Sequence, residues 1–132
     1  MPVIVQVIAT PSEQDLIDLR KIYADAPAWL FAPYADADAL IEQASRQGRL
    51  IAGRFNDRLL GAAILEQLDD RWRLSHLCVR KVTRERGVAR RLLDEARRQA
   101  YGTGQPLHLA APTDHLESQA LAARCQLPLE CL

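Results

Sequence analysis

The fold of this chain is decided by Leu77–Arg91, which reads LCVRKVTRERGVARR. Apolar residues come first, as in a strand, and a helical pattern begins at Val88, directly after Gly87. The first amides of a helix have no partners within the helix, so they form a natural anion site. Gly87 lets the backbone approach a ligand closely, and the small Ala89 keeps the next turn open. The stretch therefore predicts a strand–turn–helix unit that binds phosphate.

Arginines surround this turn, and their guanidinium groups suit the geometry of phosphate. They are Arg84, Arg86, Arg90 and Arg91. The plain alternative is a solvated, arginine-rich loop that caps a helix. The stretch is not a Walker A loop, because Lys and Ser or Thr do not follow the glycine. It is not a GxGxxG loop either, because it holds a single glycine.

The charge of the chain is zero overall but unevenly distributed. Between Arg80 and Arg98 stand eight basic and three acidic residues, so the remainder is acidic. A local basic stretch on an otherwise acidic protein favours one localised anionic ligand over a broad nucleic-acid surface. An aromatic content of 5% also argues against nucleic acid as a partner.

The length of 132 residues predicts a single domain over 1–132, with an ordinary globular composition. No apolar run approaches the roughly 20 residues of a membrane span, and the first residues lack the features of a signal peptide. The cysteines Cys78, Cys125 and Cys131 lack CxxC spacing. We therefore expect reduced thiols in a cytoplasmic protein, with neither a disulfide framework nor a metal site.

Strand and helix signals alternate along the rest of the chain, which predicts an α/β layered domain. Ser12 and Asp15 form a capping box, Asn56-Asp57 suits a left-handed turn, and Asp114 with Glu117 caps the last helix. The expected elements are, in order, a strand at 3–8, helices at 12–23 and 36–47, strands at 50–55, 59–65 and 72–80, a helix at 88–100, a strand at 106–111, a helix at 114–124 and a short strand within 128–132.

The spacing Arg84-x-x-Gly87-x-Ala89 matches the Q/R-x-x-G-x-G/A acyl-CoA motif of the GNAT acetyltransferases. It follows Leu77-Cys78-Val79, which stands at the place of their L-x-V strand. The chain therefore resembles this family. The resemblance implies the GNAT fold, a mixed central sheet of about six strands with about four helices, here truncated at the C-terminus.

The chain resembles most closely the PanZ (PanM) family, GNAT-like acetyl-CoA sensors that promote maturation of the aspartate decarboxylase zymogen. Three stretches carry the likeness: Gln14–Ile22, Arg54–Leu60 and Leu77–Val88. The similarity runs from about Ile4 to Glu95, and beyond it only the general GNAT layout remains. The stretch 36–47 departs from that family as an extra helix-forming insert.

The resemblance implies acetyl-CoA or CoA as the ligand, held in a notch between the motif strand and the strand at Leu107–Ala111. The backbone of Leu77 and Val79 would face the pantetheine arm, and the amides of Thr83–Arg90 would hold the pyrophosphate. The implied cofactor-binding residues are Leu77, Cys78, Val79, Thr83, Arg84, Glu85, Arg86, Gly87, Val88, Ala89 and Arg90.

The catalytic residues of a transferase cannot be identified from the sequence. Many GNAT enzymes carry a general-acid tyrosine in the last helix, but alignment on Ala120 puts Arg124 at that place, and no tyrosine follows Tyr101. His76 could act as a base, although a strand histidine among apolar neighbours is more often structural. Cys78 is interpreted as a buried, inert thiol.

Two functions remain open. The missing acid favours an acetyl-CoA-responsive regulator of a protein partner such as an aspartate decarboxylase zymogen. The alternative is an active N-acetyltransferase that moves the acetyl group to a small-molecule or protein amine. The PanZ likeness implies that Arg54 and Asn56 contact the partner, whereas without it they read as a hairpin turn and its flank. Neither nucleic acid nor a membrane is expected as a partner.

Overall fold

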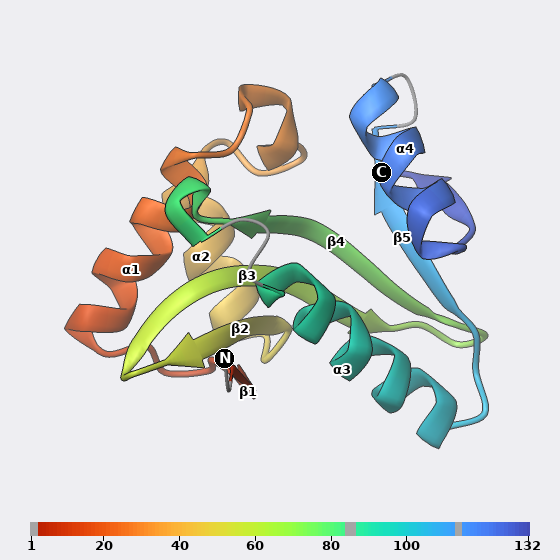
Figure 1. Ribbon diagram of the computed structural model, residues 1–132, viewed down its shortest axis with the longest axis horizontal. Helices are drawn as coiled ribbons and strands as arrows, with labels where there is room; N and C mark the ends of the chain where they lie inside the picture. The colour runs from red at the N-terminus through yellow and green to blue at the C-terminus, as the bar shows by residue number, and fades with distance from the viewer. Residues whose placement is uncertain (1–2, 84–86, 113–114) are drawn as a thin grey trace.

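A six-stranded mixed sheet with its strands in chain order forms the centre of the computed structural model (Figure 1). The structure describes residues 3–83, 87–112 and 115–132. The first four strands are antiparallel, whereas the last two join the sheet in parallel. The strands are β1 (Ile4–Val7), β2 (Leu50–Phe55), β3 (Arg58–Gln67), β4 (Trp72–Val79), β5 (Leu107–Ala111) and β6 (Leu129–Cys131).

Helices cover both faces of this sheet and bury two separate apolar clusters against it. One cluster joins α1 and α2 to the first strands, with Leu19 and Leu40 fully buried. The other joins α3 to the opposite face, and Ala122 of α4 belongs to it. The helices are α1 (Glu13–Ala24), η1 (Ala28–Phe31), α2 (Ala37–Arg46), η2 (Lys81–Thr83), α3 (Val88–Gly102) and α4 (Leu116–Cys125). The predicted α/β fold is confirmed.

Local capping signals set the ends of the first elements as predicted. The Ser12 hydroxyl accepts from the Asp15 amide at 3.1 Å, and the Asp15 carboxylate accepts from the Ser12 amide at 3.4 Å. Asp36 caps α2 in the same way. Asn56 and Asp57 turn the chain between β2 and β3 with φ of 48° and 64°, a conformation that these residue types tolerate.

The predicted start of the last helix is wrong. Helix α4 begins at Leu116, and its N-cap is His115, which makes no side-chain capping hydrogen bond. Asp114, the predicted cap, lies outside the described residues. The ring of His115 stacks on Trp29, with ring centroids 4.2 Å apart. His115 itself is extended, with φ −99° and ψ 128°, so it precedes the first turn of the helix.

Candidate functional site

A groove opens where strands β4 and β5 separate (Figure 1). Their parallel pairing ends at Ser75 and Ala110, after which β4 continues to Val79 and β5 to Ala111. The groove has a volume of about 1410 Å³. Its walls come from both strands, the end of α1, η1, the first turns of α3, and α4. The notch expected between these two strands is therefore present.

A bulge in β4 accompanies this separation. Ala62 pairs with Cys78 and Ile64 with Ser75, so Ala63 of β3 faces two residues, His76 and Leu77. His76 takes up the extra length with a φ of 54°. A bulge bends its strand and increases the local twist. Beyond Ser75, β4 no longer pairs with β5. The edge of β4 that faced β5 borders the groove there.

The start of α3 lies at the groove and is positioned by two glycines of the sheet. A Cβ on Gly61 would lie 2.8 Å from Cγ1 of Val88, and one on Gly53 would lie 3.4 Å from the same atom. Glycine at position 61 therefore lets the helix approach β3 this closely, whereas the tightest neighbour of Gly53 is Val3, at 2.9 Å. Sequence reasoning missed these two positions, whose one signal is a glycine inside a strand.

Gly87 caps α3 in a left-handed conformation, with a φ of +83°. Nothing lies within 4 Å of the place where its Cβ would stand. Helix α3 has 15 residues, and its first backbone amides lie next to open space at the groove. This geometry has the form that the predicted anion site requires, a helix start with accessible amides.

The groove carries charges of both signs. Its described basic residues are Lys81, Arg90, Arg97 and Arg124, and its acidic residues are Asp25, Asp94 and Glu117. The Asp25 carboxylate accepts from the amide of Lys81 at 2.9 Å, which ties the end of α1 to η2. Arg97 donates to the carbonyl of Cys125 and so holds the end of α4 to α3.

The groove brings together most of the predicted cofactor-binding residues. Those that line it are Leu77, Cys78, Val79, Thr83, Gly87, Val88, Ala89 and Arg90. Arg84, Glu85 and Arg86 lie outside the described residues. Arg54 and Asn56, predicted to contact a partner, lie apart at the β2–β3 hairpin. Arg54 donates to both oxygens of Asp15, at 3.1 and 3.2 Å, whereas Asn56 is exposed.

His76 and Cys78 are both buried beside the groove. His76 Nε2 lies 2.8 Å from the carbonyl of Ala32 and must donate there, which leaves Nδ1 to accept from the Ser75 hydroxyl, also at 2.8 Å. Burial lowers the pKa of His76, and nearby Arg73 lowers it further, so the ring is neutral near pH 7. The Cys78 thiol donates to the carbonyl of Ile22 at 3.3 Å, in keeping with a structural role.

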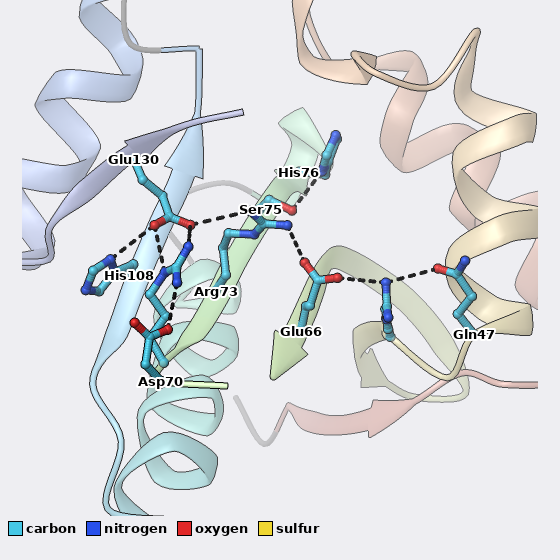
Figure 2. Close-up of polar contacts among 10 residues, drawn as sticks. Gln47, Glu66, Asp70, Arg73, Ser75, His76, His108 and Glu130 are labelled. Atoms are coloured by element: carbon cyan, nitrogen blue, oxygen red, sulfur yellow. Dashed lines mark hydrogen bonds and ion pairs between the residues drawn. The ribbon is translucent and has the colours of Figure 1, made fainter. Parts of the chain in front are cut away.

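An ion network crosses the sheet from β3 to β6 (Figure 2). Glu66 pairs with Arg49 and Arg73, and Arg73 also reaches Glu130. Glu130 further accepts from Arg71 at 2.8 Å. Burial raises the pKa of Glu130, but hydrogen bonds from Arg71 and His108 outweigh it and leave that pKa below its usual value. The network therefore fastens the short strand β6 to the sheet.

The fold and the groove define a GNAT acetyltransferase domain. A family model described as an acetyltransferase (GNAT) domain, PanZ, matches residues 2–129. The chain belongs to this PanZ family.

Curated relatives and solved structures agree with this assignment. The chain is 38% identical over 91 residues to a PanD regulatory factor of Escherichia coli and 36% identical over 84 residues to that of Salmonella typhimurium. These matches span 69% and 64% of this chain, but only 63% and 58% of the relatives. The chain thus matches about three fifths of the length of either relative.

Solved structures share the fold at low sequence identity. N-acetylglutamate synthase from Neisseria gonorrhoeae, complexed with coenzyme A and N-acetyl-glutamate, superimposes with a TM-score of 0.69 at 16% identity, over 94% of this chain and 28% of the synthase. PaiA N-acetyltransferase from Thermoplasma acidophilum, in complex with coenzyme A, superimposes with a TM-score of 0.66 at 14% identity. This match covers 94% of this chain and 88% of the PaiA chain. At such identities the likeness concerns the fold alone.

Proposed function

We propose that this chain binds acetyl-CoA or CoA in the groove between β4 and β5 and regulates a protein partner in response. One observation carries the proposal: the start of α3, capped by Gly87, and the separated edge of β4 border the same groove. A helix start supplies amides for a pyrophosphate, and a strand edge supplies backbone groups for the amides of a pantetheine arm.

The residues present fit such a ligand. The amides after Gly87 would hold the pyrophosphate, and Leu77 and Val79 would face the pantetheine arm. Arg90 is exposed at the groove and can add a guanidinium contact to phosphate. When bound, acetyl-CoA supplies an activated acetyl thioester.

The features of the groove favour a regulator over an amine acetyltransferase. Arg124 lines the groove where the GNAT likeness expects a tyrosine, and a guanidinium does not give up a proton at neutral pH. Both ring nitrogens of His76 are engaged, by Ala32 and Ser75, so the ring is not open to an incoming amine. An active N-acetyltransferase remains the second candidate, supported by the GNAT fold.

The regulated partner, by the names of the relatives, is a PanD protein such as an aspartate decarboxylase zymogen. Arg54 and Asn56 are the residues that we propose contact it. The cysteines Cys78, Cys125 and Cys131 are reduced, which supports a cytoplasmic setting for this pair. Within the described ranges, every helix is too short or too polar to cross a membrane.

The test of ligand binding is titration calorimetry with acetyl-CoA. Gly87→Glu places a carboxylate at the expected phosphate position, so we expect affinity to fall about 100-fold or more. Gly104→Glu is the matched control, because Gly104 also has a positive φ, of +73°, and open space at its Cβ. If the folded Gly87→Glu variant binds acetyl-CoA with the same affinity as the parent chain, the proposed location of the binding site is wrong.

The test of regulation is co-expression with an aspartate decarboxylase zymogen. We expect processing of the zymogen with the parent chain and loss of processing with Gly87→Glu. Free-thiol release from acetyl-CoA is followed in parallel across a panel of amines. Turnover near 10 s⁻¹, a typical enzyme value, would instead establish the acetyltransferase.

A further inference from the structure

We propose that Ser75 is a nucleophile that accepts an acyl group, with His76, which lines the groove, as its base. The proposal deepens the proposed function, since acetyl-CoA bound in the groove would be the acyl donor. It assigns a chemical role to a pair of buried polar residues that ligand binding does not use.

The β4 bulge creates this pair. Neighbouring residues of a regular strand point to opposite faces of the sheet. The φ of 54° at His76 breaks that alternation and brings its ring to the side of Ser75. Ser75 Oγ lies 2.8 Å from His76 Nδ1. Figure 2 marks this contact between the two neighbouring side chains. This distance is within the hydrogen-bond reach that joins a nucleophile to its base.

The surroundings set the protonation and the orientation of the base. The carbonyl of Ala32 accepts from Nε2, so the lone pair on Nδ1 faces the Ser75 hydroxyl. The ring of Tyr34 packs edge-on against His76, at a centroid distance of 5.4 Å. Nucleophile, base and orienting carbonyl therefore follow the logic of a serine–histidine triad.

His76 lines the groove, and Ser75 precedes it at the point where β4 and β5 separate. Ser75 and Ala110 form the last pair between β4 and β5, and the next residue, His76, lines the groove. Ser75 is 6% exposed and His76 is 4% exposed, so bulk water has little access to either. An ester on Ser75 would consequently be protected from rapid hydrolysis.

The transfer balances without any oxidant or additional reactant. Ser75 Oγ forms a bond to the acyl carbon while its proton passes to His76 Nδ1. The carbon–sulfur bond then breaks, and the leaving thiolate takes that proton. The products are O-acetylated Ser75 and free CoA thiol. One molecule of bound acetyl-CoA would therefore leave the regulator covalently acetylated.

The same contacts would also form if the pair only tied the α1–α2 connection to β4, and an acyl adduct separates the two roles. The folded protein is treated with p-nitrophenyl acetate and, separately, with acetyl-CoA. Intact mass and peptide mapping then locate any acetyl group. We expect one acetyl group per chain, on Ser75, with both donors.

Matched variants make the assignment specific. Ser75→Ala removes the adduct, whereas Ser45→Ala, at a buried serine of α2, retains it. Ser118 also lines the groove, and peptide mapping distinguishes it from Ser75. His76→Gln slows acylation about 100-fold or more, the usual contribution of a general base. Should Ser75→Ala fail to fold, Ser75→Cys keeps a nucleophile of similar size and forms a thioester at the same position.

Failure of this proposal is distinct from failure of the proposed function. Acetyl-CoA binding by calorimetry without an adduct from either donor overturns the role of Ser75 and leaves the binding site standing. An adduct located on Ser118, or one that survives in Ser75→Ala, also overturns it. An adduct on Ser75 from p-nitrophenyl acetate, in a chain that does not bind acetyl-CoA, supports the nucleophile and overturns the proposed function.

Discussion

At the scale of single residues, His76 connects three parts of the chain. Its ring contacts the carbonyl of Ala32 in the α1–α2 connection, the hydroxyl of Ser75 in β4 and the ring of Tyr34. Burial disfavours a positive charge on this ring, and nearby Arg73 disfavours it further, so the neutral ring, whose Nδ1 accepts a hydrogen bond from Ser75, is the favoured form. The stability of this region therefore depends on the protonation state of one side chain.

We predict that the free energy of unfolding falls as the pH drops below about 6.5. Burial lowers the pKa of His76 in the folded state below the 6.5 of the free side chain, so the unfolded chain binds the additional proton in this range. The stabilisation is complete above the unfolded pKa and is lost as the pH falls toward the folded one. Urea unfolding at about pH 7.5 and 5.5 measures the effect.

His76→Gln is the control for this dependence, since it removes the titrating ring. A pH dependence between these two values that persists in His76→Gln contradicts the assignment to His76. The carboxylates with lowered pKa values lose their protons in a more acidic range and do not contribute to this difference. They are Asp18, Asp70, Glu95 and Glu130.

At the scale of elements, the position of α3 depends on the absence of side chains beneath it. Val88 opens the helix and is almost fully buried, directly over Gly61 and Gly53. The apolar stripe formed by Leu92, Ala96 and Ala100 continues this contact along the helix. The position of the helix start, where we propose that the pyrophosphate binds, thus depends on packing against the sheet.

We predict that Gly61→Ala weakens both the fold and the binding of acetyl-CoA. The added Cβ would lie 2.8 Å from Val88 and 3.0 Å from Val79, so the start of α3 must move. Overpacking of this kind costs about 1–3 kcal/mol of unfolding free energy. Thermal unfolding and calorimetry with acetyl-CoA measure the two effects.

Two further variants test this explanation. Gly102→Ala, at the other end of α3, places its Cβ in open space and is expected to stabilise the chain slightly. Gly61→Ala combined with Val88→Ala restores the space and is expected to recover binding. Parental affinity in Gly61→Ala alone would show that the helix start need not approach the sheet so closely.

At the scale of the whole molecule, the groove is assembled from segments that are distant in sequence. The end of α1 and η1 form one wall, and α4 forms another (Figure 1). Trp29 and His115 stack nearly parallel, at 13°, and join these two walls. Basic residues of α3 and α4 face the same space, so the charge met by a ligand is a property of the assembled fold.

We predict that the affinity for acetyl-CoA falls as ionic strength rises. Exposed charges are screened over about 8 Å at physiological salt, and phosphate contacts from arginines weaken accordingly. Calorimetry over a series of salt concentrations gives the slope of the affinity for acetyl-CoA against ionic strength. Arg90→Gln is expected to reduce the slope, whereas Arg98→Gln, at an exposed residue paired with Glu95, leaves it unchanged. An affinity independent of salt contradicts a dominant role for the arginines.

The amino-acid sequence by itself determined the order of the elements, the capping box at Ser12, the turn at Gly87 and the family likeness, because these signals depend on neighbouring residues and their spacing. Tertiary structure decided the rest. The Ser75–His76 contact requires a bulge that exists only when β4 pairs with β3. The N-cap at His115 depends on a stack with Trp29, which lies far away in the chain. Such features rest on contacts between distant residues, which no local pattern records.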